Sequence, residues 1–306
     1  MRILVTGGAG FIGSCLVDRL VEEGQTVSVV DNLSTGKKKN LNKAAAFYKM
    51  DIQSQSLARV FRDAKPEAIF HLAAQIDVRR SVTDPRFDVE NNIVGMLNLL
   101  SMAVASGCRR VIFASSGGAV YGDQETFPAP ETHATHPLSP YGVSKLAGEH
   151  YLYYYQKVCG LETTTLRYAN VYGPRQDPSG EAGVVAIFTQ KMLKGEPPII
   201  NGNGMQTRDF IFVDDVVEAN RAVLYGKLNG TFNVGTGIET SVNALFSVLN
   251  SLTGAAVKAT HGPEKKGEQF RSAIDCAKLT RSCDWSPRVS LKDGLAKTVD
   301  YFRGSH

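Results

Sequence analysis

Residues 2–13 read Arg-Ile-Leu-Val-Thr-Gly-Gly-Ala-Gly-Phe-Ile-Gly, and this stretch decides the fold. Its first five residues are mostly apolar and predict a strand, and a pattern with helical spacing follows through Val21. Gly7, Gly10 and Gly13 would let the backbone turn tightly and approach a pyrophosphate, which the N-terminus of the next helix would stabilise. The G-x-x-G-x-x-G spacing differs from the commonest dinucleotide fingerprint, and a flexible turn without a ligand would have the same composition.

A carboxylate after the second strand strengthens the cofactor interpretation. The apolar run at residues 27–30 ends in Asp31, a position suited to accepting hydrogen bonds from adenosine ribose hydroxyls. An acidic group there repels a 2′-phosphate, so we predict NAD rather than NADP. The cluster Lys37-Lys38-Lys39 lies close by in the sequence, and its positive charge would instead favour a 2′-phosphate.

Strand-like and helical patterns then alternate. Runs at residues 46–50, 68–72 and 110–114 predict strands, and patterns at 54–64 and 84–106 predict helices. Such alternation is typical of a parallel sheet with right-handed crossovers. We therefore predict an α/β fold with a doubly wound parallel sheet of the Rossmann type and a smaller α/β C-terminal substrate-binding region.

The expected domain boundary lies where the alternation of strands and helices ends. Beyond Leu166 the alternation gives way to loops rich in Gly, Pro and Asn, where specificity usually resides. We expect residues 1–167 to form the dinucleotide-binding domain, with a later segment, 208–235, interleaved in it. Residues 168–303 should form mainly the substrate region.

Ligands of such sheets bind at the carboxyl ends of the strands. The residues expected there are Asp51, Ile52, Leu72, Ala73, Ala74, Gln75 and the run from Ser115 to Gly118. His71 is most simply a buried, hydrogen-bonded histidine.

The stretch Ser139-Pro-Tyr-Gly-Val-Ser-Lys145 predicts the start of a helix that runs to about Cys159. Pro140 suits the first helical turn, and Tyr141 and Lys145, four residues apart, then share one face. A nearby ammonium favours the phenolate and so lowers the pKa of a tyrosine, which can then act as an acid or base near neutral pH. An aromatic contact beside a solvated lysine would give the same pattern.

The composition excludes several classes of protein. The 306 residues are 43% hydrophobic and 21% charged with a net charge of +4, as in an ordinary globular protein, and do not predict nucleic-acid binding. We expect no membrane span and a cytoplasmic protein, because no apolar run approaches about 20 residues and no separate targeting segment precedes the first strand. Five scattered cysteines indicate neither disulfides nor a metal site. The last three residues, 304–306, resemble a tag remnant and are left out of the fold argument.

The chain carries, in order, Thr6-Gly-Gly-Ala-Gly-Phe-Ile-Gly13, Asp31-Asn-Leu-Ser34, His71-Leu-Ala-Ala-Gln75, Asn91-Asn-Ile-Val-Gly95, Ser115-Ser116 before Val120-Tyr-Gly122, Tyr141-Gly-Val-Ser-Lys145, Arg167-Tyr-Ala-Asn-Val-Tyr-Gly-Pro174 and Arg208-Asp-Phe-Ile-Phe-Val213. With these motifs it resembles, over essentially its whole length, the extended short-chain dehydrogenase/reductases. Within them it is most similar to nucleotide-sugar 4-epimerases of the UDP-galactose type.

The resemblance implies a reversible inversion at C4 of a UDP-hexose through a transient 4-keto sugar with bound NAD. Tyr141 would be the catalytic acid/base, Lys145 would contact the nicotinamide ribose and lower the tyrosine pKa, and Ser116 would contact the sugar O4. Ser115 is the alternative, because Gly117-Gly118 makes this loop one residue longer than the commonest family version. The implied NAD-binding residues are Gly7, Gly10, Phe11, Ile12, Gly13, Asp31, Asn32, Ser34, Asp51, Ile52, Leu72, Ala73, Ala74, Gln75, Asn92, Tyr141, Lys145 and Tyr168.

The resemblance also implies a substrate site. Asn170 and Arg208 would grip the diphosphate, and the helical segment 183–193, with Val184 and Val185, would close over the uracil. The chain departs from the family pattern at Lys265, where an arginine is common, and Arg271 would compensate. Ser272 stands where a bulky tyrosine can restrict the sugar pocket, so we expect the N-acetylated UDP-sugars to be accepted as well.

Three alternatives remain at this stage. A 4,6-dehydratase would need an Asp-Glu pair where Gly117-Gly118 stands, whereas a UDP-uronate 4-epimerase or a decarboxylase stays possible. A non-catalytic NAD-binding regulator typically lacks the Tyr-Lys pair.

We expect a homodimer, because the apolar spacing of residues 84–106 and 141–159 offers helices that could pair between subunits, as in this family. Either helix could equally bury that face within its own fold.

Overall fold

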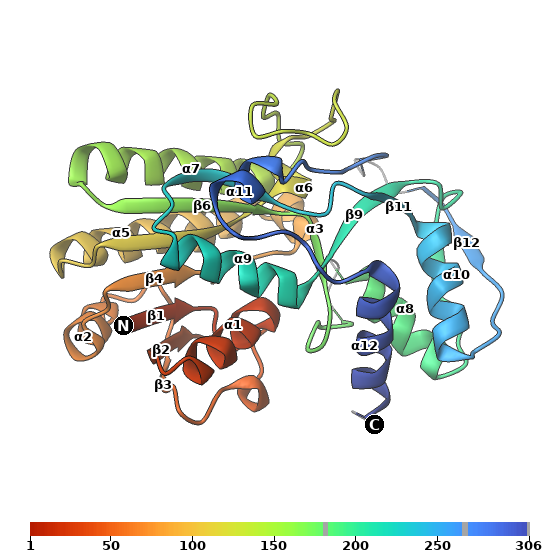
Figure 1. The fold of residues 1–306 in the computed structure, drawn as a ribbon, viewed down its shortest axis with the longest axis horizontal. Helices are drawn as coiled ribbons and strands as arrows, with labels where there is room; N and C mark the ends of the chain where they lie inside the picture. The colour runs from red at the N-terminus through yellow and green to blue at the C-terminus, as the bar shows by residue number, and fades with distance from the viewer. Residues whose placement is uncertain (180–182, 265–268, 305–306) are drawn as a thin grey trace.

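A seven-stranded sheet forms the centre of the molecule (Figure 1). The computed structural model describes residues 1–179, 183–264 and 269–304. The strand order is β10-β6-β5-β4-β1-β2-β3, and every pairing is parallel. The strands are β1 (Arg2–Thr6), β2 (Thr26–Asp31), β3 (Ala46–Lys49), β4 (Ala68–His71), β5 (Arg110–Ser116), β6 (Glu162–Tyr168) and β10 (Gly230–Val234). The predicted doubly wound parallel sheet is confirmed.

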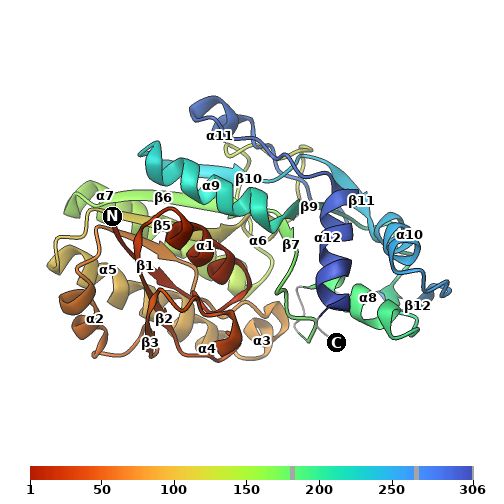
Figure 2. The same ribbon diagram turned by 60° about the horizontal axis from the view of Figure 1, so that its bottom comes forward.

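Helices cover both faces of this sheet (Figures 1 and 2). The core on one face is shared with α1 (Phe11–Glu22), α9 (Val213–Tyr225) and α11 (Ala277–Ser282). The core on the other is shared with α2 (Leu57–Ala64), α5 (Gly95–Ala105) and α7 (Pro140–Cys159). Strands that are buried on both faces read as continuous apolar runs, which is why β1, β4 and β5 were recognisable from the sequence.

The helix expected at residues 84–106 is present from Pro85 to Ala105 and contains one wide turn. The structure has α3 (Val78–Thr83), α4 (Pro85–Val89), a π-helical turn, η2 (Glu90–Val94), and then α5. Asp84 begins α4 by accepting a hydrogen bond from the Phe87 amide at 3.0 Å. A π turn is a wide turn that often marks functional sites, and this one contains Asn92.

A second, smaller lobe lies beside the sheet, on the right in Figure 1. Its own core is shared among three helices and a small sheet of order β11-β9-β7. Its elements are β7 (Asn170–Tyr172), α8 (Val184–Leu193), β8 (Ile199–Asn201), β9 (Thr207–Phe212), β11 (Glu239–Ser241), α10 (Val242–Thr253), β12 (Thr260–Gly262) and α12 (Leu291–Arg303). The short elements that remain are η1 (Lys38–Asn40) and α6 (Gly117–Val120).

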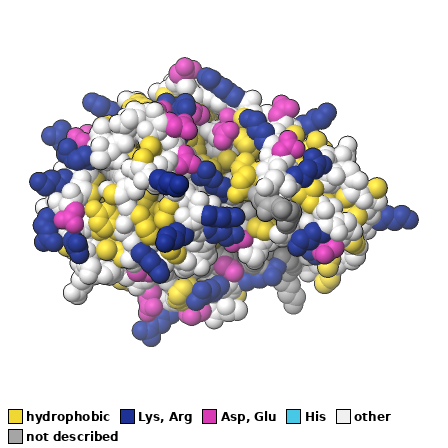
Figure 3. Space-filling view, turned by 90° about the horizontal axis from the view of Figure 1, so that it is seen from below, with side chains coloured by type: hydrophobic (Ala, Val, Ile, Leu, Met, Phe, Trp, Pro, Cys, Tyr) yellow, Lys and Arg dark blue, Asp and Glu magenta, His cyan; other side chains and the backbone are white. Residues whose placement is uncertain are grey.

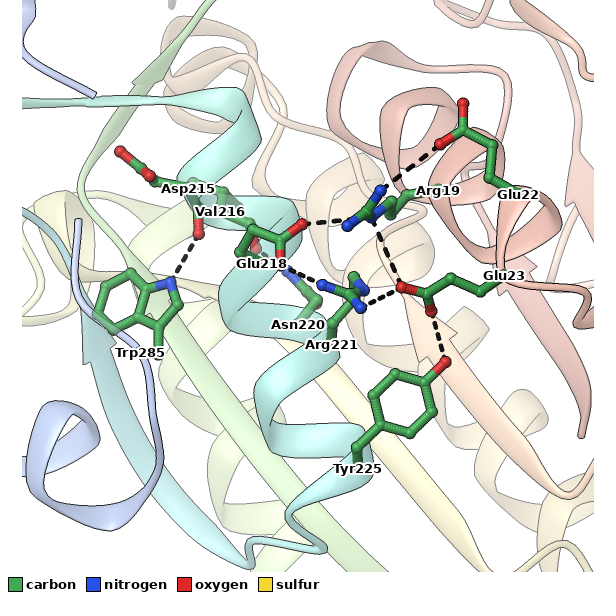
Figure 4. Close-up of polar contacts among 10 residues, drawn as sticks. All are labelled: Arg19, Glu22, Glu23, Asp215, Val216, Glu218, Asn220, Arg221, Tyr225 and Trp285. Carbon is green, nitrogen blue, oxygen red and sulfur yellow. Dashed lines mark hydrogen bonds and ion pairs between the residues drawn. The ribbon is translucent and has the colours of Figure 1, made fainter. Parts of the chain in front are cut away.

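A network of ion pairs ties α9 to α1 (Figure 4). Arg19 Nε lies 3.3 Å from Glu218 Oε1, and Arg221 is paired with Glu23. Tyr225 donates its hydroxyl to Glu23 Oε2 at 2.6 Å. The later half of the chain therefore holds the helix that follows the glycine turn.

Charged side chains do not gather into one basic face in the view from below (Figure 3), where acidic side chains lie between the lysines and arginines. In the described ranges, no helix is long and apolar enough to cross a membrane.

Candidate active site

The strand order reverses between β1 and β4, and the site is built where their carboxyl ends meet. Strands β2 and β3 lie to one side of this point, and β5, β6 and β10 lie to the other. The loops after two adjacent strands here run in opposite directions, which opens a crevice for a ligand. The predicted NAD residues come from the β1, β2 and β4 side, and the Tyr-Lys pair comes from the β5 side.

Helix α7, which carries the predicted Tyr-Lys pair, begins as the sequence predicts. Ser139 caps it by accepting a hydrogen bond from the Gly142 amide at 3.1 Å, and Pro140 occupies the first turn. The helix ends at Cys159, and Gly160 follows it with a left-handed backbone (φ 70°). Tyr141 and Lys145 share one face, with the Lys145 ammonium 5.7 Å from the Tyr141 ring centre.

The two candidate serines at the end of β5 point in different directions. Ser116 lies close enough to Tyr141 for hydrogen bonding by its hydroxyl to lower the pKa of the phenol. Ser115 points away from Tyr141 and donates to Glu149 Oε1 at 2.6 Å, within the core. Successive side chains of a strand face opposite sides, so only one of the pair can meet the tyrosine, and Ser116 is that residue.

Burial governs the proton affinity of Tyr141. Loss of solvent raises the pKa of its phenol, the Ser116 hydrogen bond lowers it, and the charge of Asp88 raises it. The low pKa expected for Tyr141 is therefore not found in this structure, because burial outweighs the influences that lower it. The phenol is held in its neutral form unless further positive charge enters the site.

Lys145 is buried as well, with 4% of its surface exposed. It donates to the Ala114 carbonyl at 2.8 Å and lies over the Phe113 ring. Burial lowers its pKa to about 8, against the opposing influences of Asp88 and Glu149. The ammonium is consequently the main form at neutral pH, and the amine becomes the main form above pH 8.

Asp88 is the carboxylate that our reading of the sequence missed. It is fully buried and accepts a hydrogen bond from Ser144 Oγ at 2.6 Å. The available signal was the spacing of Asp88 and Asn92, two polar residues four apart on an otherwise apolar helix face.

The glycine turn packs so closely that only glycine fits at two of its positions. A Cβ on Gly13 would stand 2.2 Å from the Gly7 carbonyl oxygen, and one on Gly7 (φ 72°) would stand 2.7 Å from the Ala73 amide nitrogen. Gly10 begins α1 without a side-chain cap, so the first turn, with Phe11 and Ile12, offers its N–H groups to a ligand. These features fit the pyrophosphate of a dinucleotide.

Asp31 closes the adenosine end of the same crevice. One oxygen of its carboxylate accepts a hydrogen bond from the Ala9 amide at 3.0 Å, and the other accepts from the Leu33 amide at 2.8 Å. Each oxygen keeps a further lone pair, which suits a ribose diol.

Polar residues and one buried aliphatic residue lie next to Asp31 at the same edge of the sheet. Asn32 donates to Asp51 at 2.8 Å and accepts from the Ser34 amide at 2.9 Å. Ile52 is buried beside Gly95. All four predicted residues of this group therefore lie together at the carboxyl ends of β2 and β3.

The loop after β4 is fixed by Asn92. Its side-chain amide accepts from the Gln75 N–H at 2.8 Å and donates to the Gln75 carbonyl at 3.0 Å. The Ala73 N–H donates to the Thr6 hydroxyl, so Leu72, Ala73 and Ala74 follow the strand toward the glycine turn. His71 is buried and bonded to Thr6, as predicted, and burial lowers its pKa to about 3.

Two predicted contact residues have buried side chains that point elsewhere. Tyr168 packs in the core shared with α9, and its hydroxyl pairs with Asn220. Val185 is 1% exposed in the core of the second lobe, whereas its neighbour Val184 is only partly buried. We correct both side-chain assignments, since strand and helix geometry turn these residues inward.

The residues that we expected to bind the diphosphate lie on two different faces of the small sheet. Asn170 pairs with Phe210 across β7 and β9, so its side chain shares a face with Arg208. Asn170 Oδ1 also lies 3.8 Å from where a Cβ of Gly118 would stand, close to the Ser116 loop. Arg208 donates to the Thr207 carbonyl at 2.7 Å.

Arg271 does not join them. Its guanidinium forms a two-pronged pair with Glu239, through contacts of 2.9 and 2.5 Å, and stacks on Phe127. Glu239 is also bonded to Thr207, which places this pair on the face opposite Arg208. In this structure Arg271 is thus paired with Glu239, while Lys265, for which we expected Arg271 to compensate, lies outside the described residues.

Ser272 is buried close to the catalytic loop. The next residue, Ala273, donates its N–H to Gln124 at 3.0 Å. The side chain of Ile274, on the same side of the chain as Ser272, stands 2.7 Å from where a Cβ of Gly117 would lie. Ser272 is thus two residues from a contact with the loop that carries Ser116.

No cluster of three or more His, Cys, Asp or Glu side chains that could hold a metal ion occurs among the residues that the structure describes.

Comparison with known proteins agrees with this geometry. Residues 3–235 match the model of the NAD-dependent epimerase/dehydratase family. The chain is 46% identical to the UDP-glucose 4-epimerase of Mycolicibacterium smegmatis over 311 residues, covering 99% of each chain.

Two solved structures resemble it over their full length. A UDP-glucose 4-epimerase of Thermotoga maritima with UDP-glucose is 50% identical with a TM-score of 0.96, and the match covers 100% of this chain and 99% of that one. A UDP-glucose 4-epimerase of Thermus thermophilus in complex with NAD is 43% identical with a TM-score of 0.96, with 100% of both chains covered.

Proposed function

The chain belongs to the NAD-dependent epimerase/dehydratase family and uses NAD, and from that premise we propose that it reversibly inverts C4 of UDP-hexoses, UDP-glucose and UDP-galactose first. The observation that carries the proposal is the close approach of Ser116 to Tyr141, with Lys145 on the same helix face, at the edge where the glycine turn lies. The inversion would pass through a transient 4-keto sugar.

The residues divide the work as follows. Tyr141 accepts the O4 proton as C4 is oxidised and returns it after the keto sugar has turned in the pocket. Ser116 holds O4 against the phenol and stabilises the phenolate by its hydrogen bond. The charged Lys145 favours the same phenolate. When bound, NAD would supply the hydride acceptor for C4 and a positive charge that favours the phenolate.

The chain's other residues bind and orient. Asp31 and the first turn of α1 fit the two ends of the dinucleotide, and the loop after β4 fits between them. Asn170 and Arg208 are our proposed contacts to the UDP diphosphate, for which an arginine fork is suited.

The test is a screen of UDP-sugars for C4 inversion with no added nucleotide, followed by identification of the cofactor released on denaturation. We expect UDP-glucose and UDP-galactose to interconvert, with NAD released by the denatured protein. Released NAD without turnover of any UDP-sugar would instead favour a non-catalytic NAD-binding regulator.

The other reactions of related enzymes are less well supported. Gly117 and Gly118 stand where a 4,6-dehydratase needs an acidic pair, and a glycine has no side chain that could supply either acid. A UDP-uronate 4-epimerase remains the second candidate, and UDP-glucuronate in the same screen tests it.

Ser272 should set the breadth of sugars accepted. We expect UDP-N-acetylglucosamine to be turned over at a rate comparable to that of UDP-glucose, because a small side chain leaves space near C2. In Ser272→Tyr, the preference for UDP-glucose over UDP-N-acetylglucosamine in kcat/KM should rise by at least about 10-fold. Ser272→Ala is the matched control and should keep both activities. No detectable turnover of the N-acetylated sugar by the natural protein would contradict the expectation.

We also propose a homodimer through α5 and α7. Apolar side chains at Val143, Tyr151, Tyr154 and Val158 recur at helical spacing on the exposed surface of α7. Val94 and Val104 are exposed at the adjacent α5, which is joined to α7 by a 3.1 Å hydrogen bond between Ser101 and Tyr155. These exposed apolar side chains on adjacent helices are the ones that a second copy would cover.

Light scattering at micromolar concentration tests this interface. We expect twice the mass of one chain for the natural protein and the mass of a single chain for Tyr154→Glu, which places a charge in the stripe. A natural protein that is monomeric at these concentrations would refute the dimer.

A further inference from the structure

Asp88 is a buried carboxylate without a charged hydrogen-bond partner. Its Oδ1 accepts from Asn92 Nδ2 and from Gln75 Nε2, both at 3.0 Å, and its Oδ2 accepts from Ser144 Oγ at 2.6 Å. All of its hydrogen-bond partners in the described part of the chain are neutral. A buried charge of this kind is costly unless it is fully bonded and a compensating charge is near.

The three bonds join three separate pieces of the site. Gln75 is in the loop after β4, Asn92 is in the π turn, and Ser144 is in α7 between Tyr141 and Lys145. Asn92 in turn bonds both backbone groups of Gln75. Asp88 therefore fixes the catalytic helix against the loop that flanks the cofactor crevice.

The charge of Asp88 also acts on Lys145. Two carboxylates favour the Lys145 ammonium, Asp88 from α4 and Glu149 from the next turn of α7. Glu149, however, is paired with Arg167 from β6, through contacts of 3.0 and 2.6 Å. His71 on β4 is neutral, since burial and Lys145 lower its pKa to about 3. The negative charge left uncompensated beside Lys145 is that of Asp88.

We propose that Asp88 is a positioning residue for the reaction proposed above: its carboxylate clamps α7 to the loop after β4 and keeps Lys145 in its charged form. This inference rests on the proposed function, because it assigns a task within the Ser-Tyr-Lys site. Asp88 need not touch substrate or cofactor to perform it.

Asp88→Asn separates the charge from the shape. Asparagine is nearly isosteric and can still bond to Asn92, Gln75 and Ser144, with the Ser144 hydroxyl accepting instead of donating. Removing the charge lowers the pKa of Lys145, which sets the alkaline limb of the kcat/KM pH profile, and the pKa of Tyr141, which sets the acid limb. Both limbs should therefore move to lower pH, by about 1 to 2 units. Ser144→Ala, which removes a bond but keeps the charge, should lower kcat and leave both limbs in place.

A second readout does not depend on turnover. In protein labelled with ¹³C at lysine Cε, the NMR titration of Lys145, assigned by its loss in Lys145→Met, should move to lower pH in Asp88→Asn and not in Ser144→Ala. If both limbs of the pH profile and the Lys145 titration stayed in place in a folded, active Asp88→Asn variant, the inference would be overturned. If the natural protein turned over no UDP-sugar, the proposed function would fail, while the Lys145 titration would still decide the charge effect.

Discussion

Tyr141→Phe should retain bound NAD and lose most of its activity, with kcat lower by about 100- to 10,000-fold, the usual contribution of a positioned acid/base. The substitution removes one oxygen atom from a half-buried side chain at the start of α7, whose phenol is influenced by Ser116. Because the phenol passes a proton rather than holds the cofactor, the NAD content should remain that of the natural protein.

Tyr153→Phe is the matched control, since it is the same change on the exposed surface of the same helix, at a residue that is 61% accessible and lies outside the proposed dimer surface. It should keep full activity. Turnover of UDP-glucose by Tyr141→Phe within a few-fold of the natural rate would remove Tyr141 from its assigned role.

Arg167→Met should lower the free energy of unfolding by about 3 to 5 kcal/mol, the usual result of removing one partner of a buried ion pair. The Arg167 and Glu149 side chains are each 7% exposed, and Arg167 also lies over the Tyr121 ring. Removing the guanidinium leaves the Glu149 carboxylate in the core with Ser115 as its one remaining side-chain hydrogen-bond partner among the described residues. Urea unfolding at neutral pH measures the loss.

Two further variants make the stability test specific. Arg86→Met breaks the Arg86–Glu90 pair, whose arginine side chain is 89% exposed, and should cost less than about 1 kcal/mol. Combining Arg167→Met with Glu149→Leu should recover much of the stability, because an apolar pair can replace a buried ion pair at little cost. A double variant less stable than Arg167→Met would show that the buried charge is not the cause.

Local patterns were enough to predict the parts of the site that lie within one element. The glycine turn, Asp31 at the end of β2, and Tyr141 and Lys145 on α7 each depend on a short stretch with a recognisable period or spacing. The choice between Ser115 and Ser116 was harder, because it depends on which face of β5 each residue takes once the sheet has formed.

The interactions that the sequence did not reveal join distant segments. Ser144 bonds Asp88, 56 positions away, and Arg271 bonds Glu239, 32 positions away. Nothing in the residues around Arg271 indicates that its charge is already neutralised. Likewise Tyr168 follows Arg167 in a motif, but the alternation of β6 sends the arginine toward Glu149 and the tyrosine toward Asn220.

The central claim is that the Ser116, Tyr141 and Lys145 site inverts C4 of UDP-glucose by removing hydrogen from that carbon and returning it. The most direct test uses UDP-glucose with deuterium at C4, incubated with the purified protein in ordinary water without added nucleotide, and follows the product by NMR. The account predicts UDP-galactose that keeps deuterium at C4. The account would be contradicted by UDP-galactose whose C4 deuterium has exchanged for solvent hydrogen, or by no UDP-galactose at all.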